Sequence, residues 1–254
     1  MDTITGVTNP TVKRMKALND AKGRREQNAF LVEGEVMINE ALKSGLVPVE
    51  ALCENEGPVT ETLLSAGCRV ALCARHVLEA VCDTKTPQGS CASFRLPENT
   101  VPEGAVRLLA LDGVQDPGNM GTILRTADAS DWQGAYLSDR CADVYSPKVQ
   151  RAAMGSGFRV GTARMDLPEK LMSLKKQGFS VIVSALDGDP LYERKEIPAG
   201  TKLVLVIGNE ARGVTPEVQA LADIKVKIPM RGRAESLNAA VAAGILMYEF
   251  TKEL

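Results

Sequence analysis

Three short stretches in the second half of the chain combine glycines, side-chain amides, hydroxyls and charges at close spacing. They span residues 116–127, 206–213 and 228–238. Each stretch follows or continues a segment that predicts a buried strand, and parallel α/β sheets bind ligands beyond the carboxyl ends of their strands. A single glycine-rich turn can serve only to reverse the chain. Three such turns in one region favour a ligand site with hydrogen-bonding and charged groups.

Two common kinds of site do not fit these residues. Neither G-x-G-x-x-G nor G-x-x-x-x-G-K-[ST] occurs, so an ordinary dinucleotide or P-loop enzyme is excluded. The six cysteines form no C-x-x-C pair, and the chain has one histidine, His76. A structural zinc site usually needs tighter paired ligands. We therefore expect no metal and no disulfide, reduced and mostly buried thiols, and a structural role for His76.

Hydropathy patterns place the three stretches in the second of two α/β regions. In the first region, Asn9-Pro10 predicts a helix N-cap followed by proline in the first turn, and residues 33–43 predict another helix. Buried strands are predicted at residues 29–32, 49–53, 69–73 and 90–96. Residues 97–104 contain two prolines and a glycine among polar residues, which predicts a linker.

The α/β alternation restarts after this linker. Strands are predicted at residues 106–111, 135–138, 180–186, 203–207 and 224–228. Helical patterns lie between them, and strands that alternate with helices indicate a mainly parallel sheet. A helix is expected to begin near Gly118, and the third stretch to open the C-terminal helix, with Ser236 as one possible cap.

The charge is unevenly distributed although the net charge is only −2. Residues 1–30 carry six basic side chains against three acidic ones, whereas residues 31–100 carry five basic against ten acidic. A basic segment of this size can be a solvated helix face or can contact phosphate. Composition alone leaves both interpretations open.

The three stretches resemble the signature motifs of the SpoU/TrmH family of RNA ribose 2′-O-methyltransferases, within the SPOUT superfamily. The matches are Asn119-x-Gly121-x-x-x-Arg125-Thr126-Ala127, Ile207-Gly208-Asn209-Glu210-x-x-Gly213, and Ile228-Pro229-Met230 with Ser236-Leu237-Asn238. The first region is similar to the family's N-terminal substrate-binding domain at residues 9–13, 30–34 and 86–89. One small departure, Ser130-Asp131-Trp132, leaves the motif residues intact.

The resemblance implies a particular two-domain α/β fold. A smaller N-terminal α/β domain with a ribosomal-protein-like RNA-binding fold is expected at residues 1–97, a linker at 98–104, and a SPOUT methyltransferase domain at 105–254. The second domain is expected to have a mainly parallel sheet and a deep trefoil knot, which periodicity could not indicate because knots are rare. Family members are homodimers with a shared site. Val241, Ile245 and Tyr248 on the last helix fit either that interface or an ordinary core stripe.

The resemblance also implies S-adenosylmethionine as the cofactor, bound in the knot mainly through backbone groups, and no metal. The residues expected to line the cofactor pocket are Ile207, Gly208, Asn209, Ile228, Met230 and Leu237. Those expected to act in catalysis are Asn119, Arg125, Glu210, Ser236 and Asn238. The basic residues expected to contact RNA phosphates are Lys13, Arg14, Lys16, Arg24 and Arg25.

Arg125 is the central residue of the implied chemistry. A ribose 2′-hydroxyl is a weak nucleophile, so it must be oriented and its proton removed. The family assigns that task to the arginine matching Arg125, yet an arginine stays protonated and is a poor base. We favour a role in orienting the hydroxyl and a phosphate and in stabilising the developing oxyanion, with the other four catalytic residues as the polar shell that fixes Arg125. General-base action stays open.

The function implied is 2′-O-methylation of a structured RNA, with large-subunit ribosomal RNA favoured over transfer RNA by analogy. A methyltransferase that protects a ribosomal antibiotic site, a non-catalytic RNA-binding or assembly factor, and a small-molecule methyltransferase are the alternatives. The intact Arg125 and Glu210 argue against the non-catalytic factor. No signal peptide and no apolar run long enough for a membrane span are visible, so we expect a cytoplasmic protein.

Overall fold

The computed structural model describes residues 1–194 and 196–252, which form two compact units. Unit 1 contains Met1–Glu98 together with Asp143–Phe158, and unit 2 contains residues 99–142 and the chain from Arg159 onward. The chain therefore passes between the units three times. No helix among the described residues is both long enough and apolar enough to cross a membrane.

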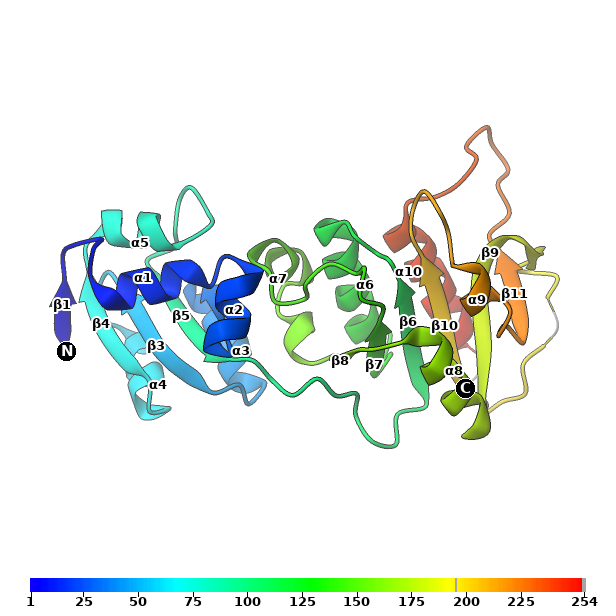
Figure 1. Ribbon diagram of the computed structural model, residues 1–254, viewed down its shortest axis with the longest axis horizontal. Coiled ribbons are helices and arrows are strands. Elements are labelled where there is room, and N and C mark those ends of the chain that lie inside the picture. Colours follow the sequence, from blue (N-terminus) through cyan, green and yellow to red (C-terminus); the bar gives the residue numbers. More distant parts are fainter. Residues whose placement is uncertain (195, 253–254) are drawn as a thin grey trace. The chain divides into compact units, whose positions relative to one another are not determined.

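Unit 1 is a five-stranded sheet with helices on both faces (Figure 1). In order across the sheet, the strands are β1 (Asp2–Ile4), β4 (Arg69–Cys73), β3 (Pro48–Cys53), β5 (Ser90–Arg95) and β2 (Ala29–Glu33). β5 runs antiparallel to both of its neighbours, and the pairs β1–β4 and β3–β4 are parallel. The four strands predicted in this region are confirmed. The three-residue β1 is too short to show a hydropathy pattern.

Two apolar clusters cover the two faces of this sheet. One joins the sheet to α1 (Pro10–Ala17) and α5 (Arg75–Val81), and the other joins it to α3 (Glu35–Lys43) and α4 (Pro58–Ser65). α1 is followed by α2 (Ala21–Gln27). The predicted N-cap is confirmed, because Asn9 Oδ1 accepts a hydrogen bond from the backbone N–H of Thr11 at 2.8 Å and Pro10 starts the helix.

The segment Asp143–Phe158 completes unit 1 and contains α7 (Pro147–Ala153) and the short 3-10 helix η1 (Ser156–Phe158). The ring of Tyr145 lies 4.8 Å from that of Phe30, and the ring of Phe158 lies 6.0 Å from it, measured between centroids. Arg24 Nη2 lies 2.6 Å from Asp143 Oδ2. No pattern in the sequence indicates that these residues return to the first region.

Unit 2 is built on a six-stranded sheet in which each pair of neighbouring strands among the described residues is parallel. In order across the sheet, the strands are β11 (Ile224–Lys227), β9 (Phe179–Pro190), β10 (Lys202–Gly208), β6 (Arg107–Asp112), β7 (Gly134–Leu137) and β8 (Gly161–Arg164). The predicted parallel sheet is confirmed, and β8 is the strand that the hydropathy pattern missed.

Helices cover this sheet as the α/β alternation requires. α8 (Leu167–Lys176) and α9 (Pro216–Gln219) pack on one face through the apolar cluster that includes Leu108, Val181 and Val204. α6 (Pro117–Ala129) and α10 (Ala239–Thr251) pack against each other. These two helices begin in the first and third glycine- and amide-rich stretches, so their packing brings the two stretches close together.

A wide bulge interrupts the pairing of β9 with β11. Val183 lies opposite Lys225, whereas Asp189 lies opposite the next residue, Val226, so residues 184–188 loop out of the ladder. A Cβ atom on Gly188 would lie 2.6 Å from the backbone nitrogen of Val226. Only glycine allows the two backbones to approach this closely, and the bulge directs residues 184–187 toward the ends of the neighbouring strands.

Candidate active site

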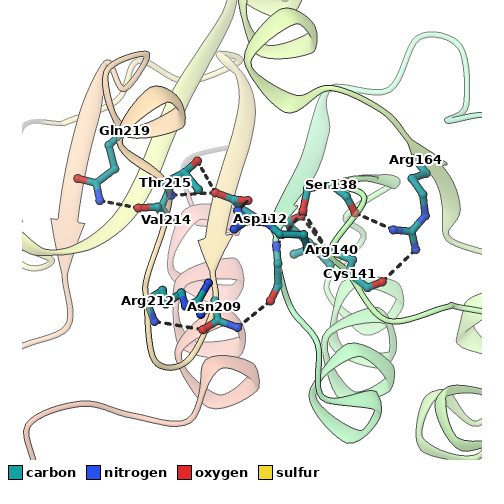
Figure 2. Close-up of polar contacts among 12 residues, drawn as sticks. Asp112, Ser138, Arg140, Cys141, Arg164, Asn209, Arg212, Val214, Thr215 and Gln219 are labelled. Atoms are coloured by element: carbon teal, nitrogen blue, oxygen red, sulfur yellow. Dashed lines mark hydrogen bonds and ion pairs between the residues drawn. The ribbon is translucent and has the colours of Figure 1, made fainter.

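A buried carboxylate fixes the loops at the carboxyl ends of β6 and β10 (Figure 2). Asp112, the last residue of β6, is 3% exposed. Its Oδ2 accepts hydrogen bonds from the backbone N–H of Thr215 at 2.8 Å and from the Thr215 hydroxyl at 2.7 Å, and its Oδ1 lies 3.2 Å from Arg140 Nη2. Because a buried charge requires such partners, Asp112 holds the loop after β10 against the end of β6.

The loop after β10 closes on itself through Asn209. Asn209 Oδ1 accepts from the backbone N–H groups of Ala211 and Arg212, and Asn209 Nδ2 donates to the Gly113 carbonyl at 2.9 Å (Figure 2). A Cβ atom on Gly208 would lie 2.3 Å from the backbone carbon of Gly213. Gly208 is therefore needed for this tight turn.

A second polar group fixes the loop after β7. Arg164, the last residue of β8, donates to the carbonyls of Ser138 at 2.7 Å and Cys141 at 3.1 Å (Figure 2). The Ser138 hydroxyl in turn accepts from the backbone N–H of Gly113 at 2.9 Å. Loops at the ends of β6, β7 and β10 are thus joined by buried or half-buried hydrogen bonds, which pre-organise this edge of the sheet.

A cavity of about 710 Å³ lies among the bulge of β9 and the loops after β10 and β11. Its lining includes residues 184–187 of the bulge and all six positions expected to contact the cofactor, namely Ile207, Gly208, Asn209, Ile228, Met230 and Leu237. Glu210 and Ser236 line it as well. The volume lies within the range of small-molecule sites in proteins, about 300–1,000 Å³.

A chain of hydrogen bonds links the three motifs beside this cavity. Asn238 Nδ2 donates to Asn119 Oδ1 at 2.8 Å, and Asn119 Nδ2 donates to Glu210 Oε1 at 2.5 Å. Asn238 Oδ1 also accepts from the backbone N–H groups of Ala240 and Val241, so Asn238 is the N-cap of α10. The possibility that Ser236 caps this helix is therefore wrong, since the helix begins three residues later.

Arg125 is not part of this hydrogen-bonded chain. It is exposed on α6 and forms no hydrogen bond or ion pair with any residue that the structure describes. It does not line the cavity. It lies six positions after Asn119, a rise of about 9 Å along the helix axis. The structure thus joins Asn119, Glu210 and Asn238, and no hydrogen bond among the described residues connects them to Arg125.

The basic residues at the start of the chain divide into two groups. Lys13, Lys16 and Arg25 are exposed. Arg14 is paired with Glu50, with Nη2 2.8 Å from Oε2, and the hydrogen bond that Arg14 donates to this carboxylate raises the pKa of Arg14. Arg24 is 4% exposed. Its guanidinium donates to Asp143 and to the carbonyls of Leu18 and Asn19.

Arg24 is accordingly corrected from an RNA contact to a structural residue, because its donors are used inside unit 1. The cysteines are free and buried, and burial raises the pKa of Cys53 to about 11 and the pKa values of Cys68 and Cys73 to about 12. His76 has the expected structural contact, with Nε2 2.9 Å from the Thr5 carbonyl. Within the described residues, no group of three or more metal-ligating side chains is placed to hold an ion.

Two family models match this chain and together span most of it. The model described as the SpoU rRNA Methylase family matches residues 107–248, and the model described as the MRM3-like substrate binding domain matches residues 9–92. The chain belongs to the SpoU rRNA methylase family. Both matches agree with the resemblance seen in the motifs, and the second places the substrate-binding model on the strands and helices of unit 1.

Several relatives match this SpoU family member along almost the whole of the chain. The chain is 38% identical over 248 residues, 98% of each chain, to the 23S rRNA (guanosine(2553)-2′-O)-methyltransferase RlmP of Bacillus subtilis. A crystal structure of AdoMet-bound rRNA methyltransferase from Sinorhizobium meliloti superposes with a TM-score of 0.90 at 31% identity, covering 100% of this chain and 98% of that one. The SpoU methyltransferase AviRb of Streptomyces viridochromogenes, in complex with AdoMet, gives 0.86 at 27% identity and covers 96% and 98%.

Motif matching missed the residues that fix the loops of the SpoU domain. Asp112 and Arg140 lie outside the three motifs, yet they hold the second motif in place. A signal was available for Asp112, because a carboxylate directly after the apolar run Leu108–Leu111 is unusual at the end of a buried strand. No comparable signal marks Arg140.

Proposed function

We propose that the protein is an S-adenosylmethionine-dependent ribosomal RNA 2′-O-methyltransferase. The observation that carries this proposal is the hydrogen-bonded chain Asn238–Asn119–Glu210, which joins the three motifs beside a cavity of about 710 Å³. The full-length identity to RlmP supports ribosomal RNA as the substrate class and the ribose 2′-hydroxyl as the acceptor. Our proposal covers the class of RNA and the acceptor group, and it does not extend to a particular nucleotide.

The residues of the cavity fit the cofactor. Ile228, Met230 and Leu237 provide apolar surface suited to an adenine ring, and Gly208 lets the backbone turn closely at the cavity wall. No cluster of lysines or arginines is needed, because S-adenosylmethionine has no phosphate. When bound, the cofactor supplies a methyl group on a positively charged sulfur, which is a good leaving group.

The chain's own residues provide orientation and charge stabilisation. The Arg125 guanidinium stays protonated, so it donates hydrogen bonds to the ribose 2′-oxygen and to a neighbouring phosphate. These donors stabilise the negative charge that develops on the oxygen as its proton passes to solvent water. Glu210 and Asn238 fix the Asn119 amide from both sides, so that its direction is set before the RNA binds.

Unit 1 contributes the RNA contacts in this proposal. Lys13, Lys16 and Arg25 are exposed on α1 and α2 and can contact phosphates. Arg14 can contribute only in part, because Glu50 holds its guanidinium. Residues 1–97 remain our proposal for the RNA-binding domain, residues 98–104 for the linker and residues 105–254 for the methyltransferase domain, which is proposed to contain the trefoil knot.

The protein is further proposed to act in the cytoplasm as a homodimer. Val241 and Tyr248 are 51% and 54% exposed on α10 and Ile245 between them is half-buried, so this face of the helix is open to a second copy. α10 packs on α6, which carries Arg125. Because Arg125 does not line the cavity of its own chain, a second copy bound through α10 would allow one chain's Arg125 to serve the other chain's cavity.

The function is tested by transfer of a tritiated methyl group from S-adenosylmethionine to RNA from cells that lack the protein. Ribosomal and transfer RNA are counted separately and digested to nucleosides. We expect label in a 2′-O-methylnucleoside of ribosomal RNA. Label in transfer RNA alone would contradict the substrate class, and neither label nor cofactor binding would contradict catalysis.

The shared site is tested by mixing two inactive variants. Arg125→Ala removes the guanidinium, and Leu237→Trp fills the cavity. If each site uses Arg125 from one chain and the cavity from the other, refolding the two variants together restores part of the activity, because mixed dimers contain one intact site. Activity that stays absent in mixed dimers would contradict the shared site.

A further inference from the structure

Arg125 shares helix α6 with a carboxylate that is well placed to capture it. Asp128 lies three residues further along the helix. Side chains at this spacing are neighbours on the helix surface, with Cβ atoms about 5–6 Å apart, and opposite charges there form ion pairs. Arg125 is nevertheless exposed and has no ion pair with any residue that the structure describes.

Asp128 is held by a different arginine. Arg159 Nε donates to Asp128 Oδ1 at 3.2 Å and to Oδ2 at 3.0 Å, and Arg159 Nη2 donates to Oδ2 at 2.7 Å. The side chains of Arg159 and Asp128 are 39% and 27% exposed, so the pair is only partly solvated. Several charge-assisted hydrogen bonds in a fork arrangement form the strong kind of arginine–carboxylate contact.

The course of the chain places Arg159 at this position. It is the first residue of unit 2 after the segment Asp143–Phe158, and its partner lies next to the last residue of α6. Arg159 therefore reaches the carboxyl end of the helix, one turn beyond Arg125.

We propose that Arg159 is a positioning residue for Arg125. By occupying the Asp128 carboxylate, it prevents an Arg125–Asp128 pair and leaves the Arg125 donors and charge available to the RNA ribose. This inference rests on the proposed function, in which Arg125 stabilises the developing oxyanion. A guanidinium neutralised by Asp128 would offer fewer donors and a weaker field to that oxygen.

The alternative role for the pair is purely structural, because it could simply fasten the end of α6. The two roles differ in the effect of a second substitution. If Arg159 only fastens the helix, removing the Asp128 charge from an Arg159→Ala variant leaves the defect or worsens it. If Arg159 keeps Asp128 away from Arg125, the same second substitution restores activity, since the captured arginine is released.

The experiment compares Arg159→Ala with Arg159→Ala/Asp128→Asn at saturating RNA and cofactor. We expect the single variant to lose about two- to fivefold in kcat, the size expected for one competing surface ion pair, and the double variant to regain the wild-type kcat. Lys175→Ala is the matched control. It removes a 2.6 Å pair with Asp223 of similar exposure, 35% and 38%, and should leave kcat unchanged.

A second readout follows Arg125 directly. The Arg125 Nε–H signal, assigned by its loss in Arg125→Lys, should shift in Arg159→Ala and return to its wild-type position in the double variant. A double variant no more active than Arg159→Ala, or an Arg125 signal that does not move, would overturn the inference. If the wild-type protein methylates no RNA, the proposed function fails, whereas the shift of the Arg125 signal still decides whether Asp128 captures Arg125.

Discussion

Helices α1 and α2 of unit 1 and helix α6 of unit 2 all carry arginines, but they use them in opposite ways. Arg14 is held by Glu50, and Arg24 is held by Asp143. Arg24 is almost completely buried. Arg125 is exposed and unpaired within the part of the chain that the structure describes. The nearby carboxylates, rather than the local density of positive charge, therefore decide which guanidinium can meet a substrate.

Removing the unpaired arginine should give the largest effect. Arg125→Ala is expected to lower kcat by about a hundredfold to a thousandfold, the cost of losing a preorganised oxyanion donor. The dissociation constant of S-adenosylmethionine, measured by calorimetry, should not change, because Arg125 does not line the cavity. Loss of cofactor binding together with activity would place Arg125 in the structure of the pocket instead.

Removing the buried arginine should affect folding rather than catalysis. Arg24→Ala leaves Asp143 and the carbonyls of Leu18 and Asn19 without their donor. Breaking a buried ion pair costs about 3–5 kcal/mol, and because Asp143 is 38% exposed we expect about 2–4 kcal/mol in urea unfolding. Arg25→Ala is the matched control, since the neighbouring residue is exposed. Equal losses in the two variants would contradict the comparison.

The exposed cations of α1 and α2 should affect RNA affinity alone. Replacing Lys13, Lys16 and Arg25 together by alanine is expected to weaken RNA binding about tenfold at moderate salt and to reduce the slope of log Kd against log salt by about 2–3. The free energy of unfolding should stay within about 0.5 kcal/mol of the wild type. An unchanged salt dependence would show that these side chains do not contact phosphate.

Alkaline pH should give the smallest effect and act on unit 1, which contains five of the six cysteines. Burial raises the pKa of Cys53 to about 11 and the pKa values of Cys68 and Cys73 to about 12, from an ordinary value of 9. From about pH 8 upward the unfolded thiols begin to ionise while the folded ones stay protonated, so the unfolded chain binds fewer protons than the folded one and stability falls as pH rises. From pH 8 to 9 the loss should be about 1 kcal/mol in urea unfolding. An equal free energy of unfolding at pH 8 and pH 9 would contradict the predicted effect of the buried thiols.

Much of the fold could be predicted because its strands carry strong local signals. β6 and β10 are buried along almost their whole length, so they appear in the sequence as continuous apolar runs. The Asn9–Pro10 cap is a local hydrogen-bonding pattern and was predicted for the same reason. The sheet-edge strand β8, of only four residues with the sequence GTAR, carries no such signal.

What could not be predicted depends on contacts between residues far apart in the chain. Arg24 reads as a surface cation in a basic segment, and only the return of Asp143, 119 residues later, makes it a buried partner. The motif residues were identified by resemblance, but spacing along α6 did not show that Asn119 would hydrogen-bond to Glu210 while Arg125 stays outside this chain of hydrogen bonds. The hydropathy pattern of the sequence indicates neither the bulge at residues 184–188 nor the Arg159–Asp128 pair.

The return of residues 143–158 to unit 1 has a consequence for the order of events during protein synthesis. A domain made of one continuous segment can finish folding as soon as that segment leaves the ribosome. Here the rings of Tyr145 and Phe158, which pack beside Phe30, are made only after residues 99–142 of unit 2. The same is true of Asp143, the ion-pair partner of Arg24. Until then Arg24 lacks its ion-pair partner, so we expect the folding of the two units to overlap in time.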